Sequence, residues 1–412
     1  MTNNIFIKCD VCGSIIDLKW QIGYLKKSVF RVNCGRCKTV IEGTLYTNDN
    51  PGFSYEIKNA TEIKAKLDFD CDYIIPISGE ILTEKMRNGD EQFKPTPFIN
   101  IVSLVGVEKF SIFNARFLNG MNQIEKLKNK CDRINELYVN KEYKYLKKMI
   151  TEDFNVKRKK WDTRKILEEK YNIDLKFYNS FVNPKKYLIL KEKIFKNYKK
   201  TKAISKLDYE NLLNFLENDV DKFEKRIRDI LNLFLENYNS FIPVLLLEYV
   251  DKIKINEIYD KYAITTVHFE DVRNLYLRIY ENIIDVSTVF VGLNNIMYRG
   301  NYQKIDDTII NKKNTIQDYK EMSKGNKIKY LTQNEIFNLL IPKFDKDIRN
   351  AIGHEDIEYD TFSQKLKYDD KEMYLMEYVF NIWKCYELCL LMYDLVLNIK
   401  LDILRKNSKG KA

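Results

Sequence analysis

Near the end of the chain, residues 347–355 read Asp347-Ile348-Arg349-Asn350-Ala351-Ile352-Gly353-His354-Glu355. The whole chain has only two histidines, and one of them is His354. Histidine is the side chain that most easily exchanges a proton near pH 7. The planar, permanently charged guanidinium of arginine suits a phosphate group. The pair Arg349 and His354 therefore indicates a site at which a proton moves beside a phosphate.

The spacing of the pair sets a geometric condition. Five positions separate Arg349 from His354, so on a continuous helix the two side chains point about 140° apart. Glycine often ends a helix in a left-handed conformation. We therefore expect Gly353 to end this helix and His354 to turn back toward Arg349.

The string from Arg349 to His354 resembles the Arg-x4-6-His motif of HEPN domains, the α-helical ribonucleases of bacterial toxins and antiphage systems. This resemblance implies that Asn350, the polar residue after the arginine, belongs to the same site. It also implies metal-independent cleavage, in which the 2′-OH of RNA attacks the adjacent phosphate and leaves a 2′,3′-cyclic phosphate and a 5′-OH. His354 would carry the proton, and Arg349 would face the developing negative charge.

In the HEPN family, two protomers place their motifs across a shared cleft, so the resemblance implies a homodimer or a higher homo-oligomer. Some HEPN toxins carry a tyrosine two residues after the histidine, which a partner nucleotidyltransferase modifies. Here that position is Asp356, and the nearest tyrosine is Tyr359. Control of that kind is therefore not expected. The other histidine, His268, has no partner at a fixed spacing, and we interpret it as structural.

Two cysteine pairs mark the other end of the chain, Cys9 with Cys12 and Cys34 with Cys37. Two CxxC pairs about twenty residues apart match a four-cysteine zinc ribbon, in which each tight turn supplies two thiolates. Two disulfides are the alternative, but the N-terminus is polar and has no signal-peptide pattern. We predict a structural zinc ion and a reducing, cytoplasmic location.

Around these pairs, Gly13 and Gly35 are expected to supply backbone freedom to the turns. The stretches 15–20 and 29–32 are predicted to pair as a small β-hairpin through their apolar residues, which are Ile15, Ile16, Leu18, Trp20, Val29, Phe30 and Val32. The other four cysteines are scattered and are interpreted as core or surface thiols: Cys71, Cys131, Cys385 and Cys389.

Composition agrees with a soluble, helix-rich protein that has an acidic partner. The 412 residues include only 14 glycines and 7 prolines, and the net charge is +10. Such a charge suits RNA, although Lys, Asn, Ile and Tyr enrichment is also typical of AT-rich genomes. No apolar run is long enough to suggest a transmembrane helix.

Changes of pattern along the chain predict a mainly α protein with four parts. They are a zinc ribbon (1–48), a β-containing extension (49–120), a helical middle or regulatory region (121–240) and a C-terminal HEPN bundle (241–412). Apolar stripes at helical spacing predict the longer helices, at 160–176, 184–206, 269–297 and 371–405. Residues 301–326 are polar and are predicted to form a loop.

Two helical stretches have a further possible role. The 184–206 stretch holds nine lysines with Tyr187, Phe195 and Tyr198 among them. This is either an RNA track or, as we prefer, a solvated face with its aromatic residues in the core. The last helix is apolar over so wide a band that part of it is expected to form a dimer seam.

Together, these features resemble zinc-finger HEPN ribonucleases of abortive infection, which phage structural proteins activate. The resemblance implies an RNA endonuclease that stays silent until a phage protein, possibly a ring-forming structural protein, is sensed through the zinc-finger region. The alternative is a non-catalytic zinc-ribbon protein that binds nucleic acid or protein, with a HEPN-like bundle for dimerisation. A transcription-linked zinc ribbon is a weaker alternative, because the second half of the ribbon is not strongly basic.

Overall fold

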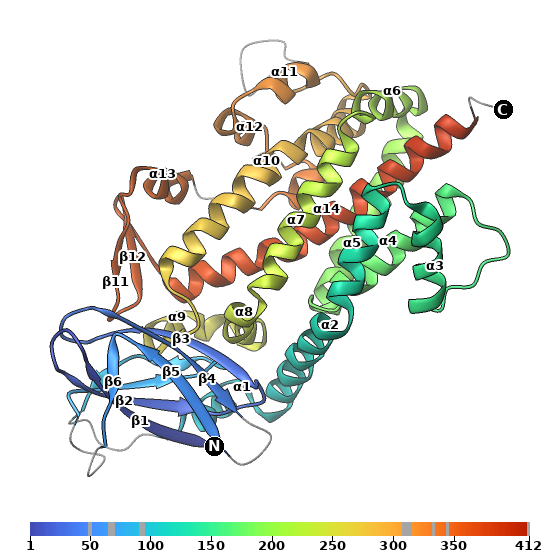
Figure 1. Ribbon diagram of the computed structural model, residues 1–412. Coiled ribbons are helices and arrows are strands. Elements are labelled where there is room, and N and C mark those ends of the chain that lie inside the picture. The colour runs from blue at the N-terminus through green and yellow to red at the C-terminus, as the bar shows by residue number, and fades with distance from the viewer. Residues whose placement is uncertain are drawn as a thin grey trace. The chain divides into compact units, whose positions relative to one another are not determined.

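Two antiparallel hairpins, each with a cysteine pair at its turn, begin the chain in the computed structural model (Figure 1). The structure describes residues 1–47, 52–64, 71–89, 95–306, 315–331, 334–342 and 346–409. Strand β1 (Thr2–Cys9) pairs with β2 (Ile15–Gln21), and β3 (Lys27–Asn33) pairs with β4 (Val40–Thr47). The predicted pairing of residues 15–20 with 29–32 is therefore wrong. Each cysteine turn is a short loop that joins its own two strands, and short loops favour the sequence neighbour as partner.

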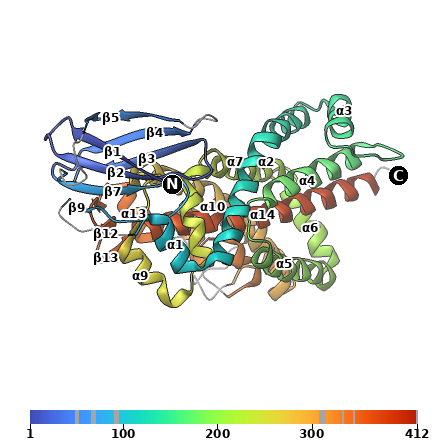
Figure 2. The same ribbon diagram turned by 90° about the horizontal axis from the view of Figure 1, so that it is seen from below.

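The later strands join the two hairpins and complete two sheets. Strand β5 (Phe53–Lys58) adds to β4, while β6 (Ala60–Glu62) adds to β1. Strand β7 (Tyr73–Ile77) lies parallel to β2 and pairs on its other side with β9 (Arg87–Asn88). Figure 2 shows β4 and β5 layered over β1, β2 and β7. Apolar side chains of both sheets, such as Trp20 and Phe30, fill one shared core between them.

Helices account for most of the remaining chain, which confirms the mainly α fold class. Those of the first half are α1 (Pro97–Val105), α2 (Val107–Val139), α3 (Tyr143–Asp153), α4 (Thr163–Asn179), α5 (Pro184–Ile204), α6 (Lys206–Leu216) and α7 (Val220–Glu236). Those of the second half are α8 (Tyr238–Leu245), α9 (Ile255–Lys261), α10 (Phe269–Arg299), α11 (Ile316–Glu321), α12 (Lys324–Leu331), α13 (Lys346–His354) and α14 (Leu375–Lys409). The described residues also form the 3-10 turns η1 (Leu246–Tyr249), η2 (Lys252–Lys254) and η3 (Ile336–Leu340).

Short strands also occur in the second half of the chain. Strand β10 (Tyr262–Ala263) pairs with β8 (Thr83–Glu84). Strands β11 (Glu358–Asp360), β12 (Lys365–Tyr368) and β13 (Lys371–Tyr374) form an antiparallel meander directly after α13. The sequence did not predict this meander, and the last helix begins at Leu375 rather than at residue 371.

The polar stretch 301–326 is also more structured than predicted. Helix α11 begins at a capping box, in which the side chains of Thr315 and Asp318 bond to each other's backbone amides. Such a box satisfies amides that a helix start otherwise leaves unpaired, so a polar sequence here forms a helix. Helix α12 follows, while residues 307–314 lie outside the described part of the chain.

Contacts divide the chain into two compact units, each assembled from three segments. Unit 1 comprises Met1–Leu118, Glu236–Tyr276 and Phe344–Trp383, and unit 2 comprises Asn119–Leu235, Leu277–Lys343 and Lys384–Ala412. The cysteine pairs and the Arg349–His354 string therefore belong to the same unit. The continuous domains 1–48, 49–120, 121–240 and 241–412 remain predictions.

Unit 2 contains a buried ionic cluster that joins three helices. The ammonium of Lys170 on α4 lies 2.9 Å from Asp174 and 2.9 Å from Glu224 on α7. Lys400 on α14 also contacts Glu224. Lys170 and Asp174 are fully buried. Buried charges persist in a protein only when they are paired, so these ion pairs fix how α4, α7 and α14 pack.

The apolar band of α14 is buried within the same chain. Its predicted members are all buried: Leu375, Val379, Ile382, Trp383, Tyr386, Leu390, Tyr393, Val396 and Leu397. These residues are therefore not available as the predicted dimer seam. Homo-oligomer formation stays an expectation that needs another surface.

Among the described residues, no single helix has both the length and the apolar composition to cross a membrane. By length and composition alone, two bent pairs meet the criterion together, α1 with α2 and α7 with the segment Tyr238–Tyr249.

Candidate functional site

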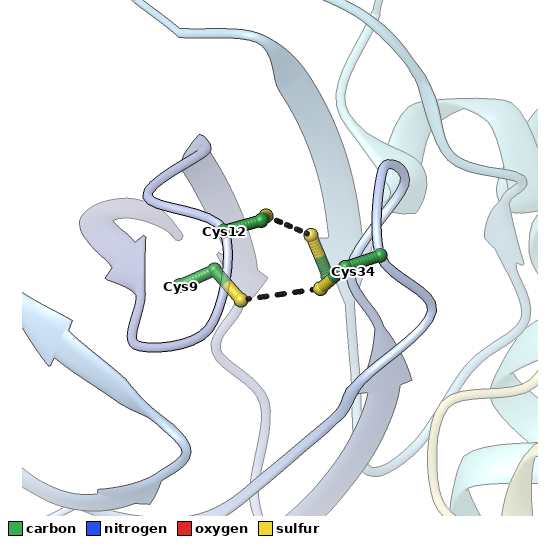
Figure 3. Close-up of side chains that lie close together, drawn as sticks. Cys9, Cys12 and Cys34 are labelled. Atoms are coloured by element: carbon green, nitrogen blue, oxygen red, sulfur yellow. Dashed lines mark hydrogen bonds between the residues drawn. The ribbon is translucent and has the colours of Figure 1, made fainter.

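The four N-terminal cysteines meet at one point of unit 1. The Sγ atoms of Cys9 and Cys37 lie 3.6 Å apart, and those of Cys12 and Cys34 lie 3.5 Å apart. All four sulfur atoms lie within 4.8 Å of one another. Figure 3 shows Cys9 and Cys12 on one turn, with their side chains directed toward the turn that carries Cys34. The structure thus brings together the four metal ligands predicted from the sequence.

The two cysteine turns have the same backbone structure. The amide of Gly13 donates to the carbonyl of Cys9, at 2.9 Å, and the amide of Lys38 donates to the carbonyl of Cys34, at 3.0 Å. Gly13 and Lys38 are both left-handed, with φ of +75° and +63°. Repetition of one turn geometry around a shared centre is how two CxxC segments supply four ligands.

Gly35 has a different role from the one predicted. Its φ is not positive, and the left-handed position of its turn is taken by Lys38. A Cβ added at Gly35 would lie 2.5 Å from the ring of Tyr73. Glycine is therefore needed there for the close approach of β7, while the prediction for Gly13 is confirmed.

Hydrogen-bond donors surround the sulfur atoms. The backbone amides of Val11 and Cys12 point at the sulfur of Cys9, and those of Arg36 and Cys37 point at that of Cys34. Donors directed at sulfur stabilise its thiolate form, which is the form that binds a metal.

In each cysteine turn, the second thiol has a lowered pKa and the first thiol has a raised pKa. The Ser14 hydroxyl lowers the pKa of Cys12 to about 6, and the Thr39 hydroxyl lowers the pKa of Cys37. Burial raises the pKa of Cys9 and raises that of Cys34 to about 12. Two thiols therefore ionise readily, and the two buried ones need a nearby positive charge to do so.

A zinc ion fits this donor set. Tetrahedral coordination with Zn–S bonds of about 2.3 Å places sulfur atoms about 3.8 Å apart, close to the separations of Cys9–Cys37 and Cys12–Cys34. These separations are far longer than the roughly 2.05 Å of a disulfide, and all four cysteines are free thiols. The cluster could therefore hold a metal ion such as zinc.

The Arg349–His354 string lies on α13. Ile348, Ala351 and Ile352 are buried and form the inner face of this helix. Asn350 and His354 are exposed, and Arg349 is half-buried. One Nη of Arg349 lies 3.5 Å from the side-chain oxygen of Asn350. The helix thus holds all three predicted catalytic side chains away from its packed face.

The predicted helix end at Gly353 is wrong. Helix α13 continues to His354, and the left-handed residue is Glu355, with φ of +61°. The amide of Asp356 then donates to the carbonyl of Ala351, at 2.8 Å, which closes the helix end. Arg349 and His354 therefore lie on one continuous helix and diverge by about 140° around its axis.

One ion pair and one short connection hold α13 to the meander that follows it. Asp347 in its first turn forms an ion pair with Lys371 of β13. Only residues 355–357 separate His354 from β11. These contacts were not predicted, because nothing in the polar sequence after the string had indicated strands.

His268, the second histidine, lies next to the start of α10. Its Nδ1 accepts the amide of Glu270 at 3.4 Å, and its ring meets that of Tyr359 edge to face, with centroids 5.5 Å apart. Burial lowers its pKa, which keeps the ring neutral. These contacts suit the structural role predicted for it.

The lysine-rich segment is α5, and its tyrosines point inward. Tyr187 and Tyr198 are buried, so they do not offer rings on which bases stack. The lysines of the same helix are exposed or half-buried, and Lys196 and Lys199 are among the exposed ones. The preferred interpretation of core aromatic residues beneath a solvated face therefore holds for the two tyrosines, while Phe195 is half-buried.

The remaining cysteines are core thiols for the most part. Cys131, Cys385 and Cys389 are buried, while Cys71 is half-buried. Burial raises the pKa of each of the four, so they are poor nucleophiles and poor metal ligands.

Comparisons with known proteins give no relative. No protein-family model matches the chain, and no curated protein or solved structure is significantly similar to it.

Proposed function

We propose that this protein is a metal-independent RNA endonuclease of the HEPN type that serves antiphage defence. The observation that carries the proposal is the placement of Arg349, Asn350 and His354 on the outward side of an amphipathic helix whose inner face is packed. A histidine and an arginine that both lie off the packed face of a helix suit acid–base chemistry on a phosphodiester.

The proposed reaction needs only groups of the chain and the RNA. His354 takes the proton of the 2′-OH as its oxygen attacks phosphorus, and the bond to the 5′-oxygen breaks. A protonated histidine returns a proton to that leaving oxygen. Arg349 neutralises the charge that develops on the phosphate, and Asn350, beside the Arg349 guanidinium, orients it.

The divergence of the two side chains supports a site made by two copies. On one α13, Arg349 and His354 point about 140° apart, so one phosphate does not readily touch both. A second copy across the cleft would supply the missing partner for each. The homo-oligomer is therefore part of the proposal.

In the same proposal, the four cysteines hold one structural zinc ion, and the zinc-finger region senses a phage protein. Zinc coordination supplies folding energy to a segment too small to be stable through its own apolar core. Rigid cysteine turns then offer a defined surface to the trigger.

Expression in cells tests the activity. Wild type, His354→Ala and the exposed-site control Arg133→Ala would be compared by total RNA sequencing, with and without phage infection. We expect infection-dependent RNA breaks and reduced phage growth with wild type and Arg133→Ala only. A His354→Ala protein that defends as well as wild type would instead favour the non-catalytic zinc-ribbon alternative.

A further inference from the structure

The turn that carries Cys34 and Cys37 contacts the hairpin that follows α13. The ammonium of Lys38 lies over the ring of Phe362, 5.6 Å from its centroid. Lys38 also contributes to lowering the pKa of Asp360. Phe362 and Asp360 belong to the β11–β12 turn, and all of these residues lie in unit 1. The turn that carries two of the candidate metal ligands thus contacts the hairpin that follows the candidate catalytic helix α13.

The β11–β12 turn is internally braced, so it can transmit a displacement. The carboxylate of Asp360 accepts the amides of Phe362 and Ser363, at 3.1 and 3.3 Å, and the Ser363 hydroxyl at 2.6 Å. Such a turn moves as one piece, because its backbone is held by its own side chain.

The turn of the hairpin is also linked to β3, the strand that leads into Cys34, through residues 264 and 265. Gln364 forms two hydrogen bonds with Ile264, one to its amide (3.1 Å) and one to its carbonyl (2.9 Å). The carbonyl of the next residue, Thr265, accepts the amide of Arg31 on β3, at 2.8 Å. The turn of the hairpin is therefore connected both to β3, through Gln364, and to Lys38, through Phe362.

The other end of the hairpin is joined to His354 by a short connection. Residues 355–357 are the whole connection from His354 to β11, and the bond from Asp356 to Ala351 closes the helix end. A cavity of about 30 Å³, lined by Asn33, Thr361 and Phe362 among others, lies at the junction with β3. It leaves the tip room for a small shift.

We propose that the β11–β12 hairpin is a positioning element that couples the metal-bound state of the Cys34–Cys37 turn to the placement of His354. Metal binding orders this turn and seats Lys38 on Phe362. Release of the metal, or a partner that reshapes the turn, withdraws Lys38 and loosens the end of α13. A ligand shifts such an equilibrium only through its different affinity for the two arrangements. The mechanical link stands on contacts alone, and its effect on RNA cleavage rests on the proposed function.

Hydrogen exchange of the full-length zinc-loaded protein, read by mass spectrometry, tests the link without any assay of cleavage. In wild type, zinc removal with a chelator should speed exchange of peptides within 351–368 by roughly tenfold. Lys38→Gly suits the left-handed backbone and deletes the ammonium, and Phe362→Ala deletes the ring. Each should keep its zinc, exchange faster in 351–368 before chelation, and show at most half of the wild-type response to it.

Two further variants serve as controls. Phe98→Ala removes a phenylalanine of similar exposure (45% against 42% for Phe362) on α1 of the same unit, and it should respond as wild type does. His354→Ala should also keep the wild-type exchange response, even if RNA cleavage proves not to depend on His354. Peptides in 351–368 that ignore zinc removal in wild type, or that respond fully in both Lys38→Gly and Phe362→Ala, would overturn the link.

Discussion

Lys38 occupies in its cysteine turn the left-handed position that Gly13 occupies in the other, and each donates its amide to the carbonyl of the first cysteine. One turn thus uses the residue best suited to positive φ, and the other pays an energetic cost for a side chain there. The Lys38 side chain is the one that reaches Phe362. The strained turn residue, Lys38, is thus the one whose side chain makes a contact outside its turn.

Substitutions at these two positions should differ in their effect on the free energy of unfolding. Gly13→Ala should destabilise the N-terminal region by about 1–2 kcal/mol, because a Cβ is strained at this φ. Its Cβ would otherwise meet only the end of Lys8, at 3.4 Å. Lys38→Gly should leave stability unchanged or raise it slightly. Denaturant unfolding of the zinc-loaded proteins measures both, and equal losses in the two variants would contradict the backbone explanation.

Each chain should bind one zinc ion through the four clustered cysteines. Cys9→Ser and Cys37→Ser should each lose the ion and lower the melting temperature, because three thiolates and a hydroxyl bind zinc far more weakly. Cys71→Ser, which changes a half-buried cysteine outside the cluster, is the matched control and should keep full zinc content. Elemental analysis decides, and full zinc content in Cys9→Ser would rule the assignment out.

The sensor role makes a separate prediction about cells. Cys34→Ser should lose phage-triggered RNA cleavage while the protein stays folded outside the N-terminal region. Limited proteolysis and circular dichroism would verify that the helices persist. Full phage defence by Cys34→Ser would show that the zinc-finger region does not sense the trigger.

The buried ionic cluster of unit 2 should control acid stability. Burial alone would raise the pKa of Glu224, but Lys170 and Lys400 outweigh burial and lower it to about 2. A lowered carboxyl pKa stabilises the folded state above the unfolded pKa of about 4.3. This contribution should be lost as the pH falls from about 4.5 toward 2.

Neutralising this carboxyl tests the same cluster at neutral pH. Glu224→Gln should cost about 3–5 kcal/mol at pH 7, because it leaves two buried ammonium groups with one fewer partner. Glu236→Gln, at the exposed end of the same helix, should change stability by less than about 0.5 kcal/mol. Chemical denaturation of both variants across pH 2–7 provides the comparison. A flat pH profile for the wild-type minus Glu224→Gln difference would contradict the assignment.

Local patterns in the sequence predicted the cysteine cluster and the longer helices, because both depend on spacing within one segment. The sequence did not predict the strand partners, because β2 pairs with β7 across more than fifty residues. Glu355 took the left-handed position expected of Gly353, although a residue other than glycine is uncommon at positive φ. Nothing in the local sequence distinguishes Lys170 and Lys400 from exposed lysines, because only folding brings Glu224 between them.

The chemistry of the RNA ends tests the central claim most directly. RNA from infected cells would be sequenced by methods selective for 2′,3′-cyclic phosphate and 5′-OH ends, with wild type, His354→Ala, Arg349→Ala and Arg133→Ala compared. Wild type and Arg133→Ala should produce new ends of both kinds, and His354→Ala and Arg349→Ala should reduce them by at least about 100-fold. Wild-type levels of these ends with His354→Ala would show that the exposed histidine of α13 does not carry the reaction.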